Sequence, residues 1–126
     1  MKILKTVRSL HYDARTGPIQ MLVLHATATR NLAQTWSYLI DSKAPNRVSA
    51  HYVIDRDGTI YQLVADDKRA WHAGVSTWPG MGNDINGVSI GIEFQCPVKA
   101  GALGGFTQKQ IAAGIRLCRL LCNMYK

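Results

Sequence analysis

The spacing of apolar and polar positions predicts strands in four parts of the chain. Residues 20–26 form an almost continuous apolar run, which predicts a buried strand. Residues 50–55 and 59–64 are each predicted to form a strand, and the Asp57-Gly58 pair between them favours a tight turn. These two segments therefore predict a hairpin, and residues 88–94 predict a fourth strand.

Two further segments have the spacing of amphipathic helices. The first is expected to begin after the cap Asn31 and to run to about Ser42, and the second to begin after the cap Thr107. The apolar positions on one face are Leu32, Trp36, Leu39 and Ile40 in the first helix, and Ile111, Ile115, Cys118 and Leu121 in the second.

The remaining segments are expected to be irregular. Residues 1–19 end at the turn signal Gly17-Pro18 and are expected to form an N-terminal extension to a domain of residues 20–126. Residues 66–87 form a long Gly-rich loop, and such loops inside compact domains are usually functional. The order of elements predicts an α/β domain with a single mixed β-sheet and helices packed on it. The chain ends soon after the second helix, so no later element is expected to cover the other side of the sheet.

Length and composition fit one globular domain. The chain has 126 residues, of which 47% are hydrophobic, and this disfavours disorder over most of its length. No apolar run approaches the roughly 18 residues needed to span a bilayer, so membrane insertion is not expected. The N-terminus lacks the continuous apolar segment of a signal peptide, because Lys5 and Arg8 interrupt it. The protein is therefore expected to be cytoplasmic, unless another route exports it.

The chain is basic, with a net charge of +7 spread along its length. This charge predicts a general attraction to polyanions, such as nucleic acid, anionic lipid or an anionic cell-wall polymer. No nucleic-acid-binding motif is present, so a nucleic-acid partner is not expected. Three cysteines disfavour a disulfide framework. Cys118 and Cys122 have a spacing that suits two metal ligands, but small buried core residues are the favoured interpretation.

The only glutamate of the chain, Glu93, lies in the apolar strand of residues 88–94. Burial of a carboxylate among apolar residues disfavours its charged form and raises its pKa. A carboxylate that is buried in this way usually either forms an ion pair or takes part in a reaction. Glu93 is therefore a candidate general base, and the alternative is an ion pair with a Lys or Arg behind the sheet.

Three histidines are candidates for a site. His25 ends the first strand, where it is either a metal ligand or a hydrogen-bonded core residue. His51 begins the hairpin and either lines a site or forms hydrogen bonds within the sheet. His72 follows Trp71 in the Gly-rich loop, a pairing that suits sugar or peptide binding, unless Trp71 is a buried anchor of the loop.

Five segments resemble, in the same order, the zinc-dependent N-acetylmuramoyl-L-alanine amidases of the type 2 family. That family includes bacterial amidases, phage lysozyme-amidases and animal peptidoglycan recognition proteins. The segments are VLHAT at 23–27, SAHYVI at 49–54, DGTIYQLV at 57–64, AWHAG at 70–74 and NGVSIGIE at 86–93. The resemblance covers roughly residues 20–125 and implies the amidase type 2, peptidoglycan-recognition-like fold.

The resemblance also implies an activity and roles for particular residues. The family cleaves the amide between N-acetylmuramic acid and the L-alanine of the stem peptide, so the implied partner is peptidoglycan or a muropeptide. His25 matches the first zinc ligand, and Glu93 matches the general base that acts on the zinc-bound water. Ala50 stands where phage and animal relatives carry a catalytic tyrosine, which is typical of the glutamate-using branch. The residues implied in substrate binding are Trp71, His72, His51 and Asn86.

The chain departs from the family pattern at its C-terminus. The other two zinc ligands of the family, a histidine and an aspartate or cysteine, follow the last helix, whereas this chain ends at Lys126. The chain is therefore expected to be C-terminally incomplete, with an incomplete zinc site. It is interpreted as part of a longer amidase, and a phage-type, bacteriolytic endolysin that reaches the wall at lysis is one form that such an enzyme takes. The alternatives are a non-catalytic peptidoglycan-binding module and a zinc site completed by His51, His72 or a partner chain.

Overall fold

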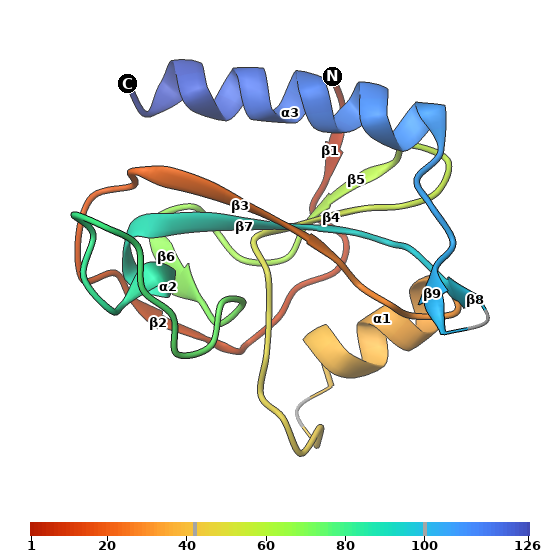
Figure 1. The fold of residues 1–126 in the computed structure, drawn as a ribbon, viewed down its shortest axis with the longest axis horizontal. Coiled ribbons are helices and arrows are strands. Elements are labelled where there is room, and N and C mark those ends of the chain that lie inside the picture. Colours follow the sequence, from red (N-terminus) through yellow and green to blue (C-terminus); the bar gives the residue numbers. More distant parts are fainter. Residues whose placement is uncertain (42, 100) are drawn as a thin grey trace.

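The computed structural model describes residues 1–41, 43–99 and 101–126, and its centre is a five-stranded mixed sheet (Figure 1). The strand order is β1-β5-β4-β7-β3. The strands are β1 (Ile3–Leu4), β3 (Met21–Ala26), β4 (Tyr52–Ile54), β5 (Ile60–Gln62) and β7 (Ser89–Phe94). Strand β7 pairs in parallel with both β3 and β4, whereas β4 and β5 form the antiparallel hairpin, and β1 lies parallel to β5.

Helices cover both faces of the sheet, which gives three layers (Figure 1). Helix α3 (Gln108–Met124) lies along one face, and α1 (Leu32–Leu39) lies against the other. The smaller elements are the short helix α2 (Ile85–Val88) and two antiparallel pairs, β2 (Tyr12–Ala14) with β6 (Lys68–Ala70) and β8 (Val98–Lys99) with β9 (Ala102–Leu103). No helix of the described part of the chain is long and apolar enough to cross a membrane.

Side chains along each strand point alternately to the two faces of the sheet, so the core consists of two clusters, one on each face. In β4, Tyr52 and Ile54 belong to the cluster under α3, while Val53 belongs to the cluster under α1. Helix α3 approaches the sheet closely at Gly114, where an added Cβ would lie 2.6 Å from the ring of Phe94. A larger residue at this position would therefore push the helix away from the sheet.

A buried glutamine fastens α3 to the ends of two strands. Gln110 is fully buried, and its Nε2 donates to the carbonyls of Ile54, at 3.1 Å, and Gln95, at 2.7 Å. Its Oε1 accepts from the backbone N–H of Thr107, whose hydroxyl in turn accepts from the N–H of Gln110. This capping box begins the helix and also satisfies two strand carbonyls.

The structure confirms most of the predicted elements. The strand of residues 20–26, the hairpin and the caps Asn31 and Thr107 are all present. The first helix ends at Leu39, and the predicted end near Ser42 lies outside the described residues.

Two expectations of irregular structure were wrong. Residues 1–19 contain β1 and β2, and residues 66–87 contain β6 and most of α2. These strands are only two or three residues long, so they leave no periodic pattern, and their partners are distant in sequence.

The predicted inner face of α3 was right at Leu121, which is buried, and at Cys118, which packs against the core, but wrong at its other positions. Ile111 and Ile115 are 48% and 49% exposed, and Cys122 is exposed as well. The core side of the helix carries Gln110, Ala113, Gly114, Leu117 and Leu121. The face of α3 that packs on the sheet has the small residues that allow close approach. Ile111 and Ile115 instead line an apolar hollow of about 530 Å³ beside β3.

Replacement of Gln110 by Leu is expected to lower the free energy of unfolding by about 2–4 kcal/mol, measured by urea denaturation. The apolar side chain has a similar size but removes a donor from two buried carbonyls, that of Gln95 and that of Ile54, of which Ile54 keeps only the bond from the backbone N–H of Gln95. The matched control is Gln108→Leu, at an exposed position two residues earlier, which should change stability by no more than about 0.5 kcal/mol. Equal effects of the two variants would contradict this role.

Candidate active site

The parallel pairing of β3 with β7 brings His25 beside Glu93. The two residues are direct partners in the register, and Val53 of β4 is the partner of Glu93 on the other side. Directly paired residues of neighbouring strands project from the same face of a sheet. His25, Val53 and Glu93 therefore share the face that α1 covers, although 68 positions separate His25 from Glu93.

Glu93 is held in this face without a charged partner. Its Oε2 is buried and makes no hydrogen bond within the described residues. The ion pairs of the described residues join Lys68 to Asp67 and Arg69 to Asp13 and Asp84, so the alternative of a Glu93 ion pair is not observed. Desolvation by burial raises the pKa of Glu93 from 4.5 to about 7. A carboxyl with that pKa can both accept and donate a proton near neutral pH.

A cavity of about 310 Å³ opens beside Glu93, between the end of β3 and α1. Its wall includes a chain of hydroxyls in which Thr29 Oγ1 lies 2.7 Å from both Thr27 Oγ1 and Thr35 Oγ1. Ala28, also in this wall, has a φ of 54°, in the left-handed region that costs a non-glycine residue about 1–2 kcal/mol. The backbone after His25 is therefore strained next to the candidate base, which is common at functional sites.

The ring of His72 lies between His25 and β7. Its Nδ1 is 3.0 Å from Nε2 of His25, and its Nε2 is 3.0 Å from the hydroxyl of Ser89. Glycine is required at position 91 because an added Cβ would lie 2.3 Å from this ring. Burial lowers the pKa of His72 to about 3 and also lowers the pKa of His25, so both rings are neutral at pH 7.

His51 is a buried hydrogen-bonding residue of the sheet. Its exposed fraction is 0%, so the structure offers none of its surface to a ligand. The N–H of Gly91 donates to its Nδ1 at 3.0 Å, and its Nε2 lies 2.9 Å from the carbonyl of Lys68. Of the two roles that the sequence left open, hydrogen bonding within the sheet is the one observed. Burial lowers its pKa to about 4.

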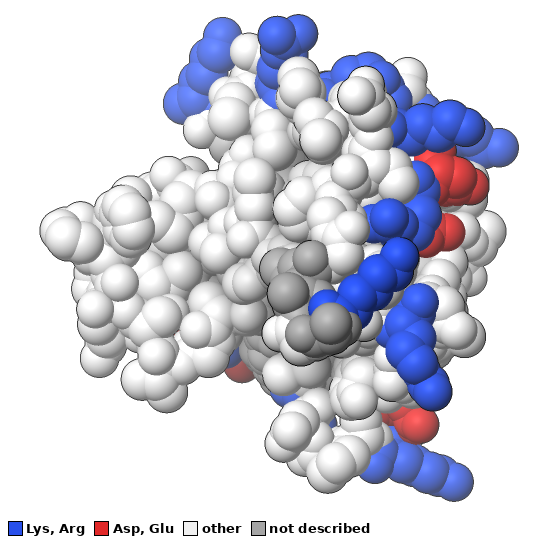
Figure 2. Space-filling view, turned by 45° about the vertical axis from the view of Figure 1, so that its right-hand side comes forward, with Lys and Arg blue, Asp and Glu red and all other residues white. Residues whose placement is uncertain are grey.

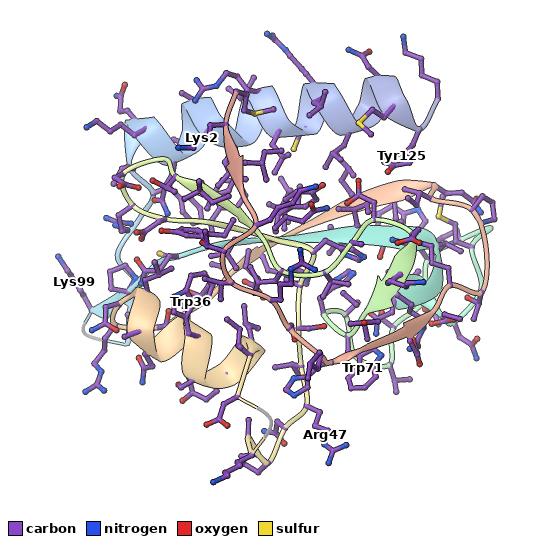
Figure 3. The ribbon with its side chains drawn as sticks, turned by 180° about the vertical axis from the view of Figure 1, so that it is seen from behind. Lys2, Trp36, Arg47, Trp71, Lys99 and Tyr125 are labelled. Carbon is purple, nitrogen blue, oxygen red and sulfur yellow. The ribbon has the colours of Figure 1, made fainter. Side chains whose placement is uncertain are left out.

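Asn86 and Trp71 hold the loop that carries His72. The side-chain oxygen of Asn86 accepts from the backbone N–H of His72, at 3.1 Å, and of Ala73, at 2.9 Å. Trp71 stacks on His11, with ring centroids 6.0 Å apart and planes 1° from parallel. Figure 3 shows Trp71 on the α1 side of the sheet, away from α3. Contact of these residues with a substrate stays a prediction.

Two residues near the site were missed from the sequence. His11 packs on Trp71, and the guanidinium of Arg15 donates to the carbonyls of Asp66, Gly87 and Ser89. Both lie in the segment that was expected to be irregular, which hid their contacts. No local pattern marked them, because their partners lie more than 50 residues away in the sequence.

A second hollow, a groove along β3, also has His25 in its wall. Its volume is about 660 Å³, and its wall runs from Gln20 to His25 and includes Trp78 and Met81 of the loop. Trp78 is 58% exposed, so its ring is available for stacking at the rim. A groove of this size and apolar character is typical of small-molecule sites.

The described residues fit one metal ligand but not a complete metal site. His25 has a neutral ring with one nitrogen, Nδ1, that makes no hydrogen bond within the part of the chain described. No group of three His, Cys, Asp or Glu residues that could hold a metal ion is found there. Cys118 and Cys122 lie on α3, which covers the opposite face of the sheet. Cys118 lines the hollow beside β3 that His25 also borders, but the two form no group of three metal-binding residues in the described chain.

Comparison with known proteins assigns a family to this arrangement. The family model described as N-acetylmuramoyl-L-alanine amidase matches residues 15–126. The 1,6-anhydro-N-acetylmuramyl-L-alanine amidase AmpD of Citrobacter freundii is 59% identical over 49 residues, 39% of this chain and 26% of that protein. AmpD of Haemophilus influenzae is 34% identical over 108 residues, 72% of this chain and 58% of that protein. The chain thus spans less than two thirds of the length of these relatives.

Solved structures show the same fold. A crystal structure of a selenomethionine derivative of AmpD has a TM-score of 0.76 at 33% identity, covering 96% of this chain and 74% of that one. The amidase AmiD from Escherichia coli, in complex with the substrate anhydro-N-acetylmuramic acid-L-Ala-D-gamma-Glu-L-Lys, has a TM-score of 0.72 at 31% identity. That match covers 90% of this chain and 47% of the AmiD chain.

The raised pKa of Glu93 predicts a particular dependence of stability on pH. Unfolded chains lose the Glu93 proton near pH 4.5, whereas the folded protein keeps it to about pH 7. Raising the pH between these values therefore favours unfolding, by roughly 3 kcal/mol in total, and lowering it restores stability. Glu93→Gln should remove this contribution, so the variant should exceed the original protein in stability at pH 8 but not at pH 4.

Denaturant unfolding at a series of pH values measures this difference. The exposed carboxyl of Asp67 provides a control, because Asp67→Asn should not change the pH profile between 4.5 and 7. A Glu93→Gln profile parallel to that of the original protein would show that the carboxyl is not desolvated.

Proposed function

The chain belongs to the N-acetylmuramoyl-L-alanine amidase family, and on that premise we propose that it cleaves the amide between N-acetylmuramic acid and the L-alanine of the stem peptide. The observation that carries the proposal is the pairing of His25 with Glu93 on neighbouring parallel strands. Amide hydrolysis needs a group that activates water and a group that moves protons, and these two side chains supply one of each type.

Glu93 is suited to both proton transfers of the reaction. Its pKa of about 7 leaves it partly ionised at neutral pH. As a carboxylate it accepts the proton of the attacking water, and as an acid it returns a proton to the departing amine of L-alanine. The buried Oε2 has no protein partner in the described chain, so it is free to bind that water.

His25 is the residue that would hold zinc in this chain, as the family resemblance implies. Bound zinc supplies a Lewis acid for the scissile carbonyl and lowers the pKa of its water. His25 contributes a neutral imidazole nitrogen, the form that metals bind. The described residues supply no second or third ligand.

The groove along β3 is the proposed substrate site. It reaches His25, and its mixture of apolar wall and exposed Trp78 suits a sugar ring joined to a short peptide. The E. coli relative AmiD binds a muropeptide of this class, which supports the same class of ligand here.

The charge of the surface also favours a wall-derived substrate. Lys and Arg side chains gather along the upper and right-hand edges of the molecule in Figure 2, whereas Asp and Glu are few. Helix α3 carries Lys109, Arg116 and Arg119 and no acidic residue. Such a field attracts anionic polymers and raises the rate of encounter with them.

A non-catalytic peptidoglycan-binding module is the second candidate. One observation favours it, namely that no group of three metal-binding side chains is found in the described residues. The two functions differ in whether a bound muropeptide is cut.

The test incubates the 126-residue chain with excess zinc and an anhydromuramyl tripeptide, and measures release of the stem peptide by mass spectrometry. Binding is followed separately through tryptophan fluorescence. We expect slow release, because this chain should hold zinc weakly, and we expect Glu93→Gln to reduce release by about 100-fold or more while binding is kept. Asp67→Asn is the control and should behave like the original chain.

The other possible results of this experiment would contradict the hydrolase, the binding module or both. Binding without release in the presence of zinc would overturn the hydrolase and favour the binding module. Equal release by Glu93→Gln would remove Glu93 from the reaction, and failure of the chain to bind the muropeptide would overturn both functions.

A further inference from the structure

A line of hydrogen bonds connects the first residue of α2 to the candidate metal ligand. The hydroxyl of Ser89 lies 2.6 Å from the carbonyl of Ile85 and 3.0 Å from Nε2 of His72. The other ring nitrogen of His72, Nδ1, lies 3.0 Å from Nε2 of His25. Four groups, from α2, β7, β3 and the loop that carries His72, therefore form one continuous relay.

The chemistry of the groups fixes the direction of every bond in this relay. A carbonyl can only accept, so the single hydroxyl proton of Ser89 is donated to Ile85. The hydroxyl oxygen must then accept from Nε2–H of His72. A neutral imidazole carries one proton, so Nδ1 of His72 is an acceptor, and Nε2 of His25 must be the donor.

The last bond determines which nitrogen of His25 is available. Because its proton resides on Nε2, its Nδ1 carries a lone pair and makes no hydrogen bond in the described chain. The opposite direction would place two donors or two acceptors against each other at Ser89. The relay therefore selects one of the two tautomers of His25.

The surroundings keep the relay rigid. Ser89 and Ile85 are buried, and Asn86, which is 6% exposed, holds the backbone of His72. The absence of a side chain at Gly91 lets the ring of His72 lie against β7. Its two ring hydrogen bonds and the close approach to Gly91 therefore restrict the rotation of the His72 ring.

We propose that His72 is a positioning residue, which with Ser89 holds His25 as the Nε2–H tautomer and directs its Nδ1 lone pair toward a metal ion. The identity of the metal as zinc rests on the proposed function, whereas the tautomer does not. Metal-binding histidines commonly donate their other N–H to a fixed partner, and loss of that partner typically costs 10- to 100-fold in metal affinity. His72 thus acts on the reaction through His25 rather than by contact with the substrate.

The test is nitrogen-15 NMR of the labelled, metal-free chain, in which protonated and unprotonated ring nitrogens are distinguished directly. We expect His25 to be protonated at Nε2 and unprotonated at Nδ1. In Ser89→Ala, His72 loses the acceptor for its Nε2–H, so a substantial share of His25 should move its proton to Nδ1. His72→Asn should keep the original pattern of His25, because its amide oxygen replaces the acceptor, whereas His72→Leu should not.

Two controls accompany these variants. Ser37→Ala, at an exposed position of α1, should leave all ring nitrogens unchanged. His51 provides an internal reference, because Gly91 donates to its Nδ1 and so keeps its proton on Nε2 in every variant. An Nδ1–H tautomer of His25 in the original chain, or an unchanged tautomer in both Ser89→Ala and His72→Leu, would overturn the proposal.

Titration with excess zinc alone tests the second half of the proposal. Zinc should shift the Nδ1 resonance of His25, and the apparent affinity should fall 10- to 100-fold in Ser89→Ala. Zinc binding at Nε2, or no effect of zinc on His25, would overturn the assignment of Nδ1 as the ligand atom. These results do not depend on hydrolysis, so a failure of the proposed activity is distinguishable from a failure of the relay.

Discussion

The parallel, in-register pairing of β3 with β7 is the constraint on which the candidate site depends. It places His25 directly beside Glu93, and the pairing of β7 with β4 adds Val53 on the other side. Because side chains alternate between the faces of a strand, a slip of one residue would move His25 to the α3 side of the sheet. The apolar residues of β7 that pack under α3, such as Ile90 and Ile92, oppose such a slip.

The same strands combine stabilising and destabilising features. Ile90, Ile92 and Phe94 contribute to the core under α3, while Glu93 between them is buried without a partner. Strained Ala28 lies nearby at the end of β3. The site is thus less stable than an apolar surface would be, and the core on the opposite face offsets that cost. A carboxyl kept uncharged to near neutral pH is the functional product of this arrangement.

Much of the fold was predictable because its signals are local. Asn31, Thr107 and the Asp57-Gly58 pair mark caps and a turn through short-range hydrogen bonds that any sequence window contains. The short strands β1 and β2 were not predictable, since they pair with partners more than 50 residues away. His25 and Glu93 were identified from chemistry and resemblance, but the roles of His51, Ser89 and Asn86 depend on contacts that only the folded chain makes.

The candidate site requires that His25 and Glu93 lie side by side on one face of the sheet. Nuclear Overhauser spectroscopy on the isotope-labelled chain measures this directly. We expect cross-peaks from the methylene protons of Glu93 to both the ring of His25 and the methyl groups of Val53, with none from the His25 ring to Leu117 of the α3 core. Cross-peaks between His25 and Leu117, together with none between His25 and Glu93, would contradict the register and the site that is built on it.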